Sequence, residues 1–352
     1  MKSLLQNENT TSSSKPARKV SDRRTFLAQT IGAAGLAAAA WHSSPRAEAA
    51  PPNAAVTAGD IAVLKFLAAA ELVECDLWQQ YCELAENNRA FRHALRLIDP
   101  ALPDYICQDF ADECSHAQWI NAFLASIGQS PVSLDAFRTL PSVEAQGALD
   151  IGRLTNLTNL TVDTSYYLRY RTASNPDFDP APAQIVTIQN KPSVPVSNQF
   201  APRKMQIIAQ TAAFHFAAIE QGGSSLYNAL LSKVTNLDVL RALMSIGSTE
   251  VYHFAAFQTS LEGIFKFEGA GVSFPALNRD PNRGKIMPKP CKFLDAAFPL
   301  CSVIRPRSTA NAGAIAAATG LVQSGLFTWQ PQAFFDAVVG LATAADAATR
   351  GA

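Results

Sequence analysis

The chain has 352 residues, of which 48% are hydrophobic and 16% are charged, and its formal net charge is 0. This composition predicts a globular protein with enough apolar residues to build a large core. Because the charge balance leaves no basic surplus, nucleic acid is excluded as an expected partner.

The N-terminal segment, residues 1–49, has the pattern of an export signal. A polar tract ends in Arg23 and Arg24, an apolar run follows over residues 28–41, and an Ala-Glu-Ala cleavage pattern occupies residues 47–49. The paired arginines indicate the twin-arginine type and predict a periplasmic or extracellular protein. The alternative is an uncleaved membrane anchor, for which the apolar run is short. We expect no membrane span after removal of the signal.

A first pair of helices is expected within residues 50–130. Apolar residues recur at helical spacing from Asp60 to Asn88, with Thr57 or Asp60 as the cap. A second helix is expected from Pro103 to Ile127. Because the connection between them is short, the two helices should be antiparallel.

The spacing of four cysteines agrees with this antiparallel arrangement. Within each helix the two cysteines are seven residues apart, and the numbers of Cys75 and Cys114 add to the same value as those of Cys82 and Cys107. Residues at one level of an antiparallel pair have this property, and facing Cα atoms are then roughly 3.5–5.5 Å apart. We therefore predict the disulfides Cys75–Cys114 and Cys82–Cys107. The alternatives are four buried thiols, or Cys114 as a metal ligand.

Two repeated motifs indicate the chemistry. Each reads Glu-x-x-His in an apolar run of helical period, so its carboxylate and imidazole share one helix face. Each motif follows a helix that carries a further Glu, which is the ligand pattern of di-iron and di-manganese carboxylate bundles. The hairpin register also brings these side chains to one level. The six candidate metal ligands are Glu71, Glu113, His116, Glu220, Glu250 and His253.

The residues around these motifs resemble the ferritin-like superfamily, in particular the monomer-type ferritin-like proteins that include plant desiccation-related proteins. The stretch from His116 to Gly128 is similar to the second helix of bacterioferritin-like chains, and the stretch from Ile219 to Tyr227 is similar to their third helix. The resemblance implies an all-α four-helix bundle with a long crossover between helices 2 and 3. Twin-arginine export, for its part, implies transport after folding, often with the cofactor already inserted.

Glu74 competes with Glu71 for the position in the first helix. Glu71 is preferred because an aromatic residue follows it at i+7, Trp78, as Tyr227 follows Glu220. The resemblance to bacterioferritin-like helices also favours Glu71 as the ligand. Glu74 is then expected beside the ligands or on the surface. For the two aromatic residues, packing in the core is the first interpretation and contact with the site is the second.

The remaining segments are a crossover insertion, a second helical pair and a C-terminal extension. The insertion at residues 131–201 includes two expected strands, at 161–171 and 184–189, and is expected to cover the bundle as a lid or an interface. The second pair occupies residues 202–269, with helices at 203–233 and from an Asn236 cap to about 267. The extension, residues 270–352, is irregular, with a predicted disulfide between Cys291 and Cys301 and a helix clearest at 331–347.

Four carboxylates and two imidazoles favour iron or manganese over calcium. The first functional hypothesis is an exported dimetal oxidoreductase acting on dioxygen or peroxide, like a ferroxidase or a manganese catalase. The second is a non-enzymatic stress or desiccation protein with a structural or vestigial metal site. An iron-storage subunit is a third and weaker hypothesis, because the two long insertions do not suit a compact shell. The sequence leaves the oligomeric state open.

Overall fold

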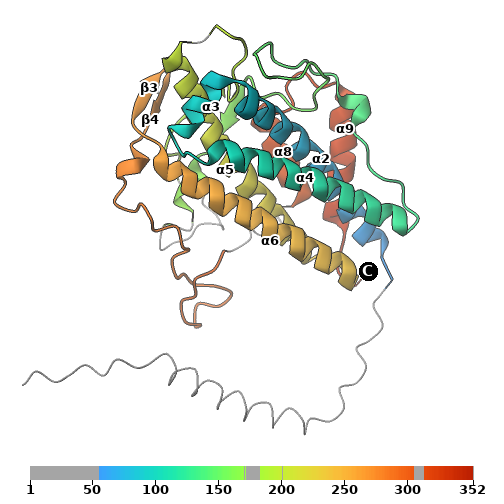
Figure 1. The fold of residues 1–352 in the computed structure, drawn as a ribbon. Helices are drawn as coiled ribbons and strands as arrows, with labels where there is room; N and C mark the ends of the chain where they lie inside the picture. The colour runs from blue at the N-terminus through green and yellow to red at the C-terminus, as the bar shows by residue number, and fades with distance from the viewer. Residues whose placement is uncertain (1–54, 170, 172–182, 200, 305–312, 352) are drawn as a thin grey trace, which may run out of the picture. The chain divides into compact units, whose positions relative to one another are not determined.

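Four long helices lie alongside one another at the centre of the fold (Figure 1). The computed structural model describes residues 55–169, 171, 183–199, 201–304 and 313–351, so the predicted signal lies outside the described residues. The four helices are α2 (Ala58–Asn87), α4 (Leu102–Ser126), α5 (Pro202–Leu231) and α6 (Leu237–Ser260). α2 packs against α4, and α5 packs against α6. The all-α bundle predicted from the sequence is confirmed.

Side-chain caps define the starts of α2 and α6. Thr57 and Asp60 form a capping box, in which Thr57 Oγ1 accepts from Asp60 N at 3.1 Å and Asp60 Oδ2 accepts from Thr57 N at 2.9 Å. Asn236 Oδ1 accepts from the amides of Asp238 and Val239. Asp60 is fully buried and also accepts from Thr235 N, so the start of α2 is joined to the α5–α6 connection.

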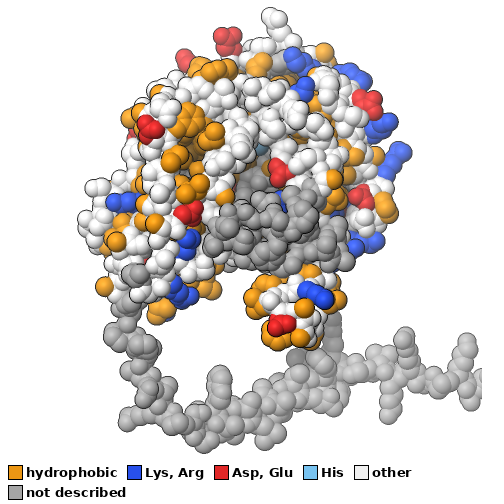
Figure 2. Space-filling model, turned by 180° about the vertical axis from the view of Figure 1, so that it is seen from behind, with side chains coloured by type: hydrophobic (Ala, Val, Ile, Leu, Met, Phe, Trp, Pro, Cys, Tyr) orange, Lys and Arg blue, Asp and Glu red, His pale blue; other side chains and the backbone are white. Residues whose placement is uncertain are grey.

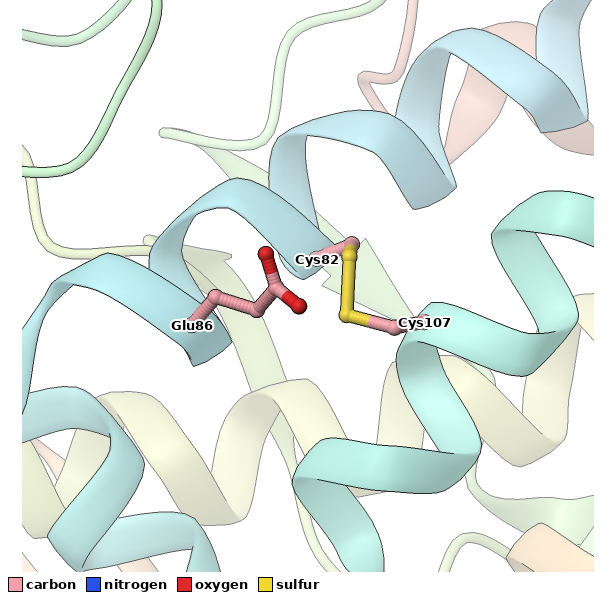
Figure 3. A group of neighbouring side chains, drawn as sticks. All are labelled: Cys82, Glu86 and Cys107. Carbon is pink, nitrogen blue, oxygen red and sulfur yellow. A yellow bond between two sulfur atoms is a disulfide. The ribbon is translucent and has the colours of Figure 1, made fainter.

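Two disulfides connect α2 to α4. Cys75–Cys114 and Cys82–Cys107 have Cα–Cα distances of 4.9 and 4.8 Å, within the range that the antiparallel register predicts. Figure 3 shows the second bond, with Glu86 one turn further along α2. Because both sulfur atoms are joined to each other, neither is a thiolate ligand, and this group of three side chains is not a metal site.

The connection between α2 and α4 is longer than the expected turn and contains α3 (Arg89–Arg96). The fourth helix is also shorter than predicted. It ends at Ser260 instead of near residue 267 and continues as the 3-10 turn η3 (Leu261–Gly263). A side chain at Gly263 would place its Cβ 1.7 Å from Ile98 O, so the chain leaves the helix where it meets the α3–α4 loop. The following residues pair as β3 (Phe267–Gly269) and β4 (Val272–Phe274).

Ion pairs to buried carboxylates attach the crossover insertion to α2. Arg153 is 1% exposed and its Nη2 lies 2.6 Å from Glu83 Oε2. Arg138 pairs with the buried Asp76 at 2.7 Å. The insertion also contains η1 (Asp135–Phe137), η2 (Ser165–Leu168) and an antiparallel pair. The strands of that pair, β1 (Leu160–Val162) and β2 (Ile188–Lys191), are shorter than the predicted ones, because the chain turns into η2 where the first was expected to continue.

The C-terminal extension packs onto the bundle through α8 (Ala314–Gln323) and α9 (Gln332–Ala347), which contact α5 and α2 respectively. It also contains η4 (Leu277–Arg279). The predicted disulfide between Cys291 and Cys301 is wrong for this structure. The two residues exchange both backbone hydrogen bonds as an antiparallel bridge. Hydrogen-bonded pairs hold their side chains further apart than non-hydrogen-bonded pairs, which disfavours an S–S bond.

None of the helices in the described ranges combines the length and the hydropathy that a membrane crossing requires. On the face shown in Figure 2, acidic and basic side chains are interspersed and neither sign forms a continuous patch among the coloured residues.

Candidate metal centre

The six ligands predicted from the sequence meet inside the bundle. α2 contributes Glu71, α4 contributes the first Glu-x-x-His motif, α5 contributes Glu220 and α6 contributes the second motif. Glu113, Glu220 and Glu250 have no exposed surface, and Glu71 is 2% exposed. The i, i+3 spacing places each Glu and His on the same inward face, as expected.

A first group of possible ligands surrounds the imidazole of His116. Its Nδ1 lies 3.4 Å from Glu71 Oε2, 3.2 Å from Glu113 Oε2 and 3.6 Å from Glu250 Oε1. One donor atom from each of these four residues lies within 4.8 Å of all the others. Three carboxylates and one imidazole at this spacing can coordinate a divalent cation.

A second group surrounds the imidazole of His253. Its Nδ1 lies 2.8 Å from Asp109 Oδ1, 3.0 Å from Glu113 Oε1 and 3.4 Å from Glu220 Oε2. These four residues meet the same 4.8 Å criterion. Glu113 belongs to both groups and turns one carboxylate oxygen toward each imidazole. The arrangement therefore has two adjacent positions that share one carboxylate.

Sequence reasoning missed Asp109, which is one of the four residues of the second group. Asp109 is 2% exposed and precedes Glu113 by four residues, so both lie on the same face of α4. An acidic residue at a core position of an amphipathic helix was the available signal. The Glu-x-x-His pattern does not include this position, and the residue was therefore passed over.

The centre has more buried charge and more unpaired polar atoms than a protein core normally tolerates. Glu71 Oε2, Glu113 Oε1, Glu220 Oε2 and both oxygens of Glu250 are buried with no hydrogen-bond partner among the described residues. Burial and neighbouring carboxylates raise the pKa of Glu113 and Glu250, and they raise that of Glu220 to about 8. Burial lowers the pKa of His253, but the carboxylates of Asp109 and Glu220 outweigh this and raise it to about 11. Bound cations would satisfy these orphaned oxygens, so the residues fit a metal centre.

Three further side chains hold the ligands in orientation. Trp78 Nε1 donates to Glu220 Oε1 at 3.0 Å, and Tyr227 OH donates to Glu71 Oε1. Asp112 Oδ2 lies 3.1 Å from His253 Nε2 and leaves Nδ1 facing the carboxylates. The two aromatic residues therefore contact the site rather than only filling the core.

Glu74 belongs to neither group, although it lies close to both. Burial, followed by the charges of Glu220 and Glu71, raises its pKa. Gly223 on α5 lies against the centre, because a Cβ there would be 2.2 Å from Glu250 Oε2 and would displace that carboxylate. The glycine lets α5 approach this carboxylate.

The bundle and its two carboxylate–histidine groups fit a dimetal-carboxylate protein. A sequence model described as Ferritin-like domain matches residues 59–263, which run from the first turn of α2 to the end of η3 and include the whole candidate centre. The chain belongs to this ferritin-like domain family. Comparison with curated proteins and with solved structures finds no match.

Proposed function

We propose that the protein binds two divalent cations, iron or manganese, and uses them in redox chemistry on dioxygen or peroxide. The observation that supports this most directly is the pair of four-residue groups sharing Glu113. Carboxylate and imidazole together suit iron and manganese. Two divalent ions would also balance the acidic side chains that the bundle buries.

Each position has its own ligands in this proposal. Glu71, His116 and Glu250 would hold one ion, Asp109, Glu220 and His253 would hold the other, and Glu113 would bridge them. When bound, the ions supply the capacity to transfer electrons to a small oxidant. Trp78 and Tyr227 restrict the rotation of the terminal carboxylates, and Asp112 retains the Nε2 proton of His253.

A groove between α4 and α6 gives a small molecule a route to the second position. Its volume is about 370 Å³, and Asp109, Asp112, His253 and Tyr252 are among its lining residues. Tyr252 is 75% exposed, so the groove opens to solvent. A dioxygen or peroxide molecule entering here would meet Asp109 and His253 before the rest of the centre.

We also propose that the protein is exported by the twin-arginine pathway. Two disulfides suit an oxidising compartment such as the periplasm. A pathway that carries folded proteins would allow the metal to be inserted before export, which suits a centre buried in a bundle.

Elemental analysis of the mature protein purified from its own host tests the proposal, together with consumption of hydrogen peroxide and of dioxygen by the same sample. We expect two iron or manganese ions per chain and turnover of one oxidant. Two ions with no turnover would favour the structural role of a stress or desiccation protein. A protein that binds no metal under any loading condition would refute the dimetal proposal and leave the non-enzymatic stress or desiccation protein with a vestigial site.

A further inference from the structure

An apolar cavity lies on the opposite side of α2 and α5 from the α4–α6 groove. It has a volume of about 260 Å³ and is bounded by α2, α5, α8 and α9. Small and apolar side chains form most of its wall, so it suits a hydrocarbon surface rather than water. Representative lining residues are Ala69, Ala70, Val73, Ala317, Leu321 and Phe327.

One wall of the cavity adjoins the candidate metal centre. Glu74 and Gly223 both line the cavity. A Cβ on Gly223 would lie 2.2 Å from Glu250 Oε2, and the Glu74 carboxyl is close enough to Glu71 and Glu220 for their charges to raise its pKa. A molecule in the cavity would therefore be separated from the ligands by little more than the α5 backbone and one carboxyl group.

One residue of the cavity wall has an unpaired polar atom. His215 lines the cavity and is 2% exposed. Its Nδ1 lies 2.8 Å from Tyr81 OH, which lies 2.6 Å from Ser193 Oγ. Its Nε2 is buried and has no hydrogen-bond partner among the described residues. Because a buried ring nitrogen without a partner is costly, a ligand atom that bonds to Nε2 would gain affinity.

The ligand atom that fits Nε2 best is an uncharged hydroxyl. Burial lowers the pKa of His215 to about 3, so the ring is neutral at ordinary pH. In a neutral ring Nε2 either donates or accepts, according to the proton arrangement among Tyr81, Ser193 and Nδ1. A hydroxyl can do both, whereas a carboxylate can only accept and would bring a charge into an apolar cavity.

A second, larger pocket adjoins the cavity. The two spaces share residues of the β1 region and α8, among them Val162, Asp163 and Gly320. The outer pocket has a volume of about 1120 Å³ and a more polar lining that includes Gln189 and Lys233. A ligand that enters the cavity through this pocket would not pass through the metal centre.

We propose that this cavity binds a compact aromatic or aliphatic alcohol, with its hydroxyl on His215 Nε2 and its hydrocarbon part between α2, α5 and α8. An apolar cavity of about 150 Å³ accommodates benzene, so the present volume corresponds to a ligand of roughly ten to twelve heavy atoms. That the bound alcohol is an organic substrate of the centre rests on the proposed function. Its binding to the cavity does not.

The test uses 2-naphthol and naphthalene as probes, which differ by one hydroxyl, with titration calorimetry on the mature protein both as isolated and after removal of metal by a chelator. The wild type should bind 2-naphthol about tenfold more tightly than naphthalene, as expected for one buried hydrogen bond. His215→Phe should remove this preference while still binding naphthalene.

Filling the cavity should weaken the binding of both probes. Gly222 and Gly320 line the cavity, and a Cβ added at either meets no described atom within 4 Å, so Gly222→Leu and Gly320→Leu should fold. Each should lower affinity for both probes at least about tenfold, since most of the buried apolar area is lost. Gly340→Leu on α9 is the matched control, because its added Cβ also meets nothing and it lies outside the cavity lining.

Failure to bind either probe up to its solubility limit would overturn the inference, and so would undiminished binding by both glycine variants. Equal affinity of the wild type for the two probes would refute the role of His215. Binding to metal-free protein separates this test from that of the proposed function. If the cavity binds 2-naphthol but the protein holds no metal, the metal proposal fails and the cavity proposal stands.

Discussion

The indole of Trp78 on α2 donates a 3.0 Å hydrogen bond to Glu220 on α5. Tyr227 on α5 donates to Glu71 on α2 in return. Each aromatic residue follows the glutamate of its own helix by seven positions and contacts the glutamate of the other helix. The two halves of the bundle therefore orient each other's terminal carboxylates.

Removing either donor should weaken metal binding without unfolding the bundle. Trp78→Phe and Tyr227→Phe keep the ring in the core but free Glu220 or Glu71 to rotate, and we expect about 10- to 100-fold lower metal affinity. Competition with a chelator of known affinity measures this. Trp119→Phe is the control, because Trp119 is 48% exposed on α4 and stacks on Phe123 away from the centre. Unchanged affinity in both core variants would contradict the orienting role.

The ligand groups predict a graded loss of metal. Glu113→Gln removes the shared carboxylate and should leave fewer than one ion per chain, whereas Asp109→Asn should lose only the second ion. Glu250→Ala removes a residue of the first group only and should lose the first ion while keeping the second. The metal-to-protein ratio after loading and gel filtration is the measurement.

The variants Glu71→Ala and Glu74→Ala test which glutamate of α2 is the metal ligand. Glu71 lies 3.4 Å from His116 Nδ1, and Glu74 is in neither group. We therefore expect metal loss from the first variant and near-normal content in the second. The reverse result would move the ligand to Glu74 and leave the rest of the site intact.

Each disulfide should contribute about 3–4 kcal/mol to the free energy of unfolding. The bonds close sequence separations of 39 and 25 residues, and the chain-entropy model gives values of this size for such loops. Denaturant unfolding of the Cys75→Ser/Cys114→Ser and Cys82→Ser/Cys107→Ser proteins tests this. Cys301→Ser should change little, because that residue is exposed and forms no disulfide in the structure. Peptide mapping that found Cys75 joined to Cys82 would exclude the register.

His215 should make the folded protein sensitive to acid. Its pKa in the folded protein is about 3, below the ordinary value of 6.5, so the unfolded chain binds an extra proton between these values. The stability linked to His215 is therefore complete above pH 6.5 and is lost as pH falls toward 3. In His215→Phe the slope of unfolding free energy against pH between 4 and 6 should fall by about 1.4 kcal/mol per pH unit. His93→Gln, at an exposed position of α3, should keep the wild-type slope.

Export is tested by replacing Arg23 and Arg24 with Lys. If the signal is of the twin-arginine type, uncleaved precursor should accumulate in the cytoplasm, because the pathway reads the paired arginines. Cell fractionation with an antibody to the mature protein measures it. Normal export of the double variant would show that another route is used.

The parts of the structure that the sequence predicted well are those governed by helical spacing. The 3.6-residue period placed the four helices, and the seven-residue separations of Cys75 from Cys82 and of Cys107 from Cys114 set their register. The same register brought Glu71 to the level of Glu113 and His116. These features depend on the spacing of residues along a regular helix, and this spacing can be read from the sequence.

The parts that were missed depend on contacts between distant segments. The end of α6 follows from Gly263 meeting Ile98, and the apolar pattern beyond Ser260 continues as if the helix did. Cys291 and Cys301 lie opposite each other in an antiparallel bridge. Whether their sulfur atoms can bond depends on whether that position is a hydrogen-bonded or a non-hydrogen-bonded one, and the sequence does not specify this. Asp109 was passed over because its role arises from the placement of His253, which comes from another helix.

The disulfides link only one of the two helix pairs that supply residues to the centre. Asp109, Glu71 and the first Glu-x-x-His motif belong to the covalently linked α2–α4 pair, whereas Glu220 and the second motif belong to α5 and α6, which share no such link in the described chain. In the proposed dimetal form, Glu220, Glu250 and His253 move away from the other ligands when these two helix pairs separate, and nothing covalent at the level of the centre opposes that separation. The residence time of the ions would therefore depend on the packing between the two helix pairs. Reducing the disulfides should lower the melting temperature more than it hastens the escape of metal from the folded protein.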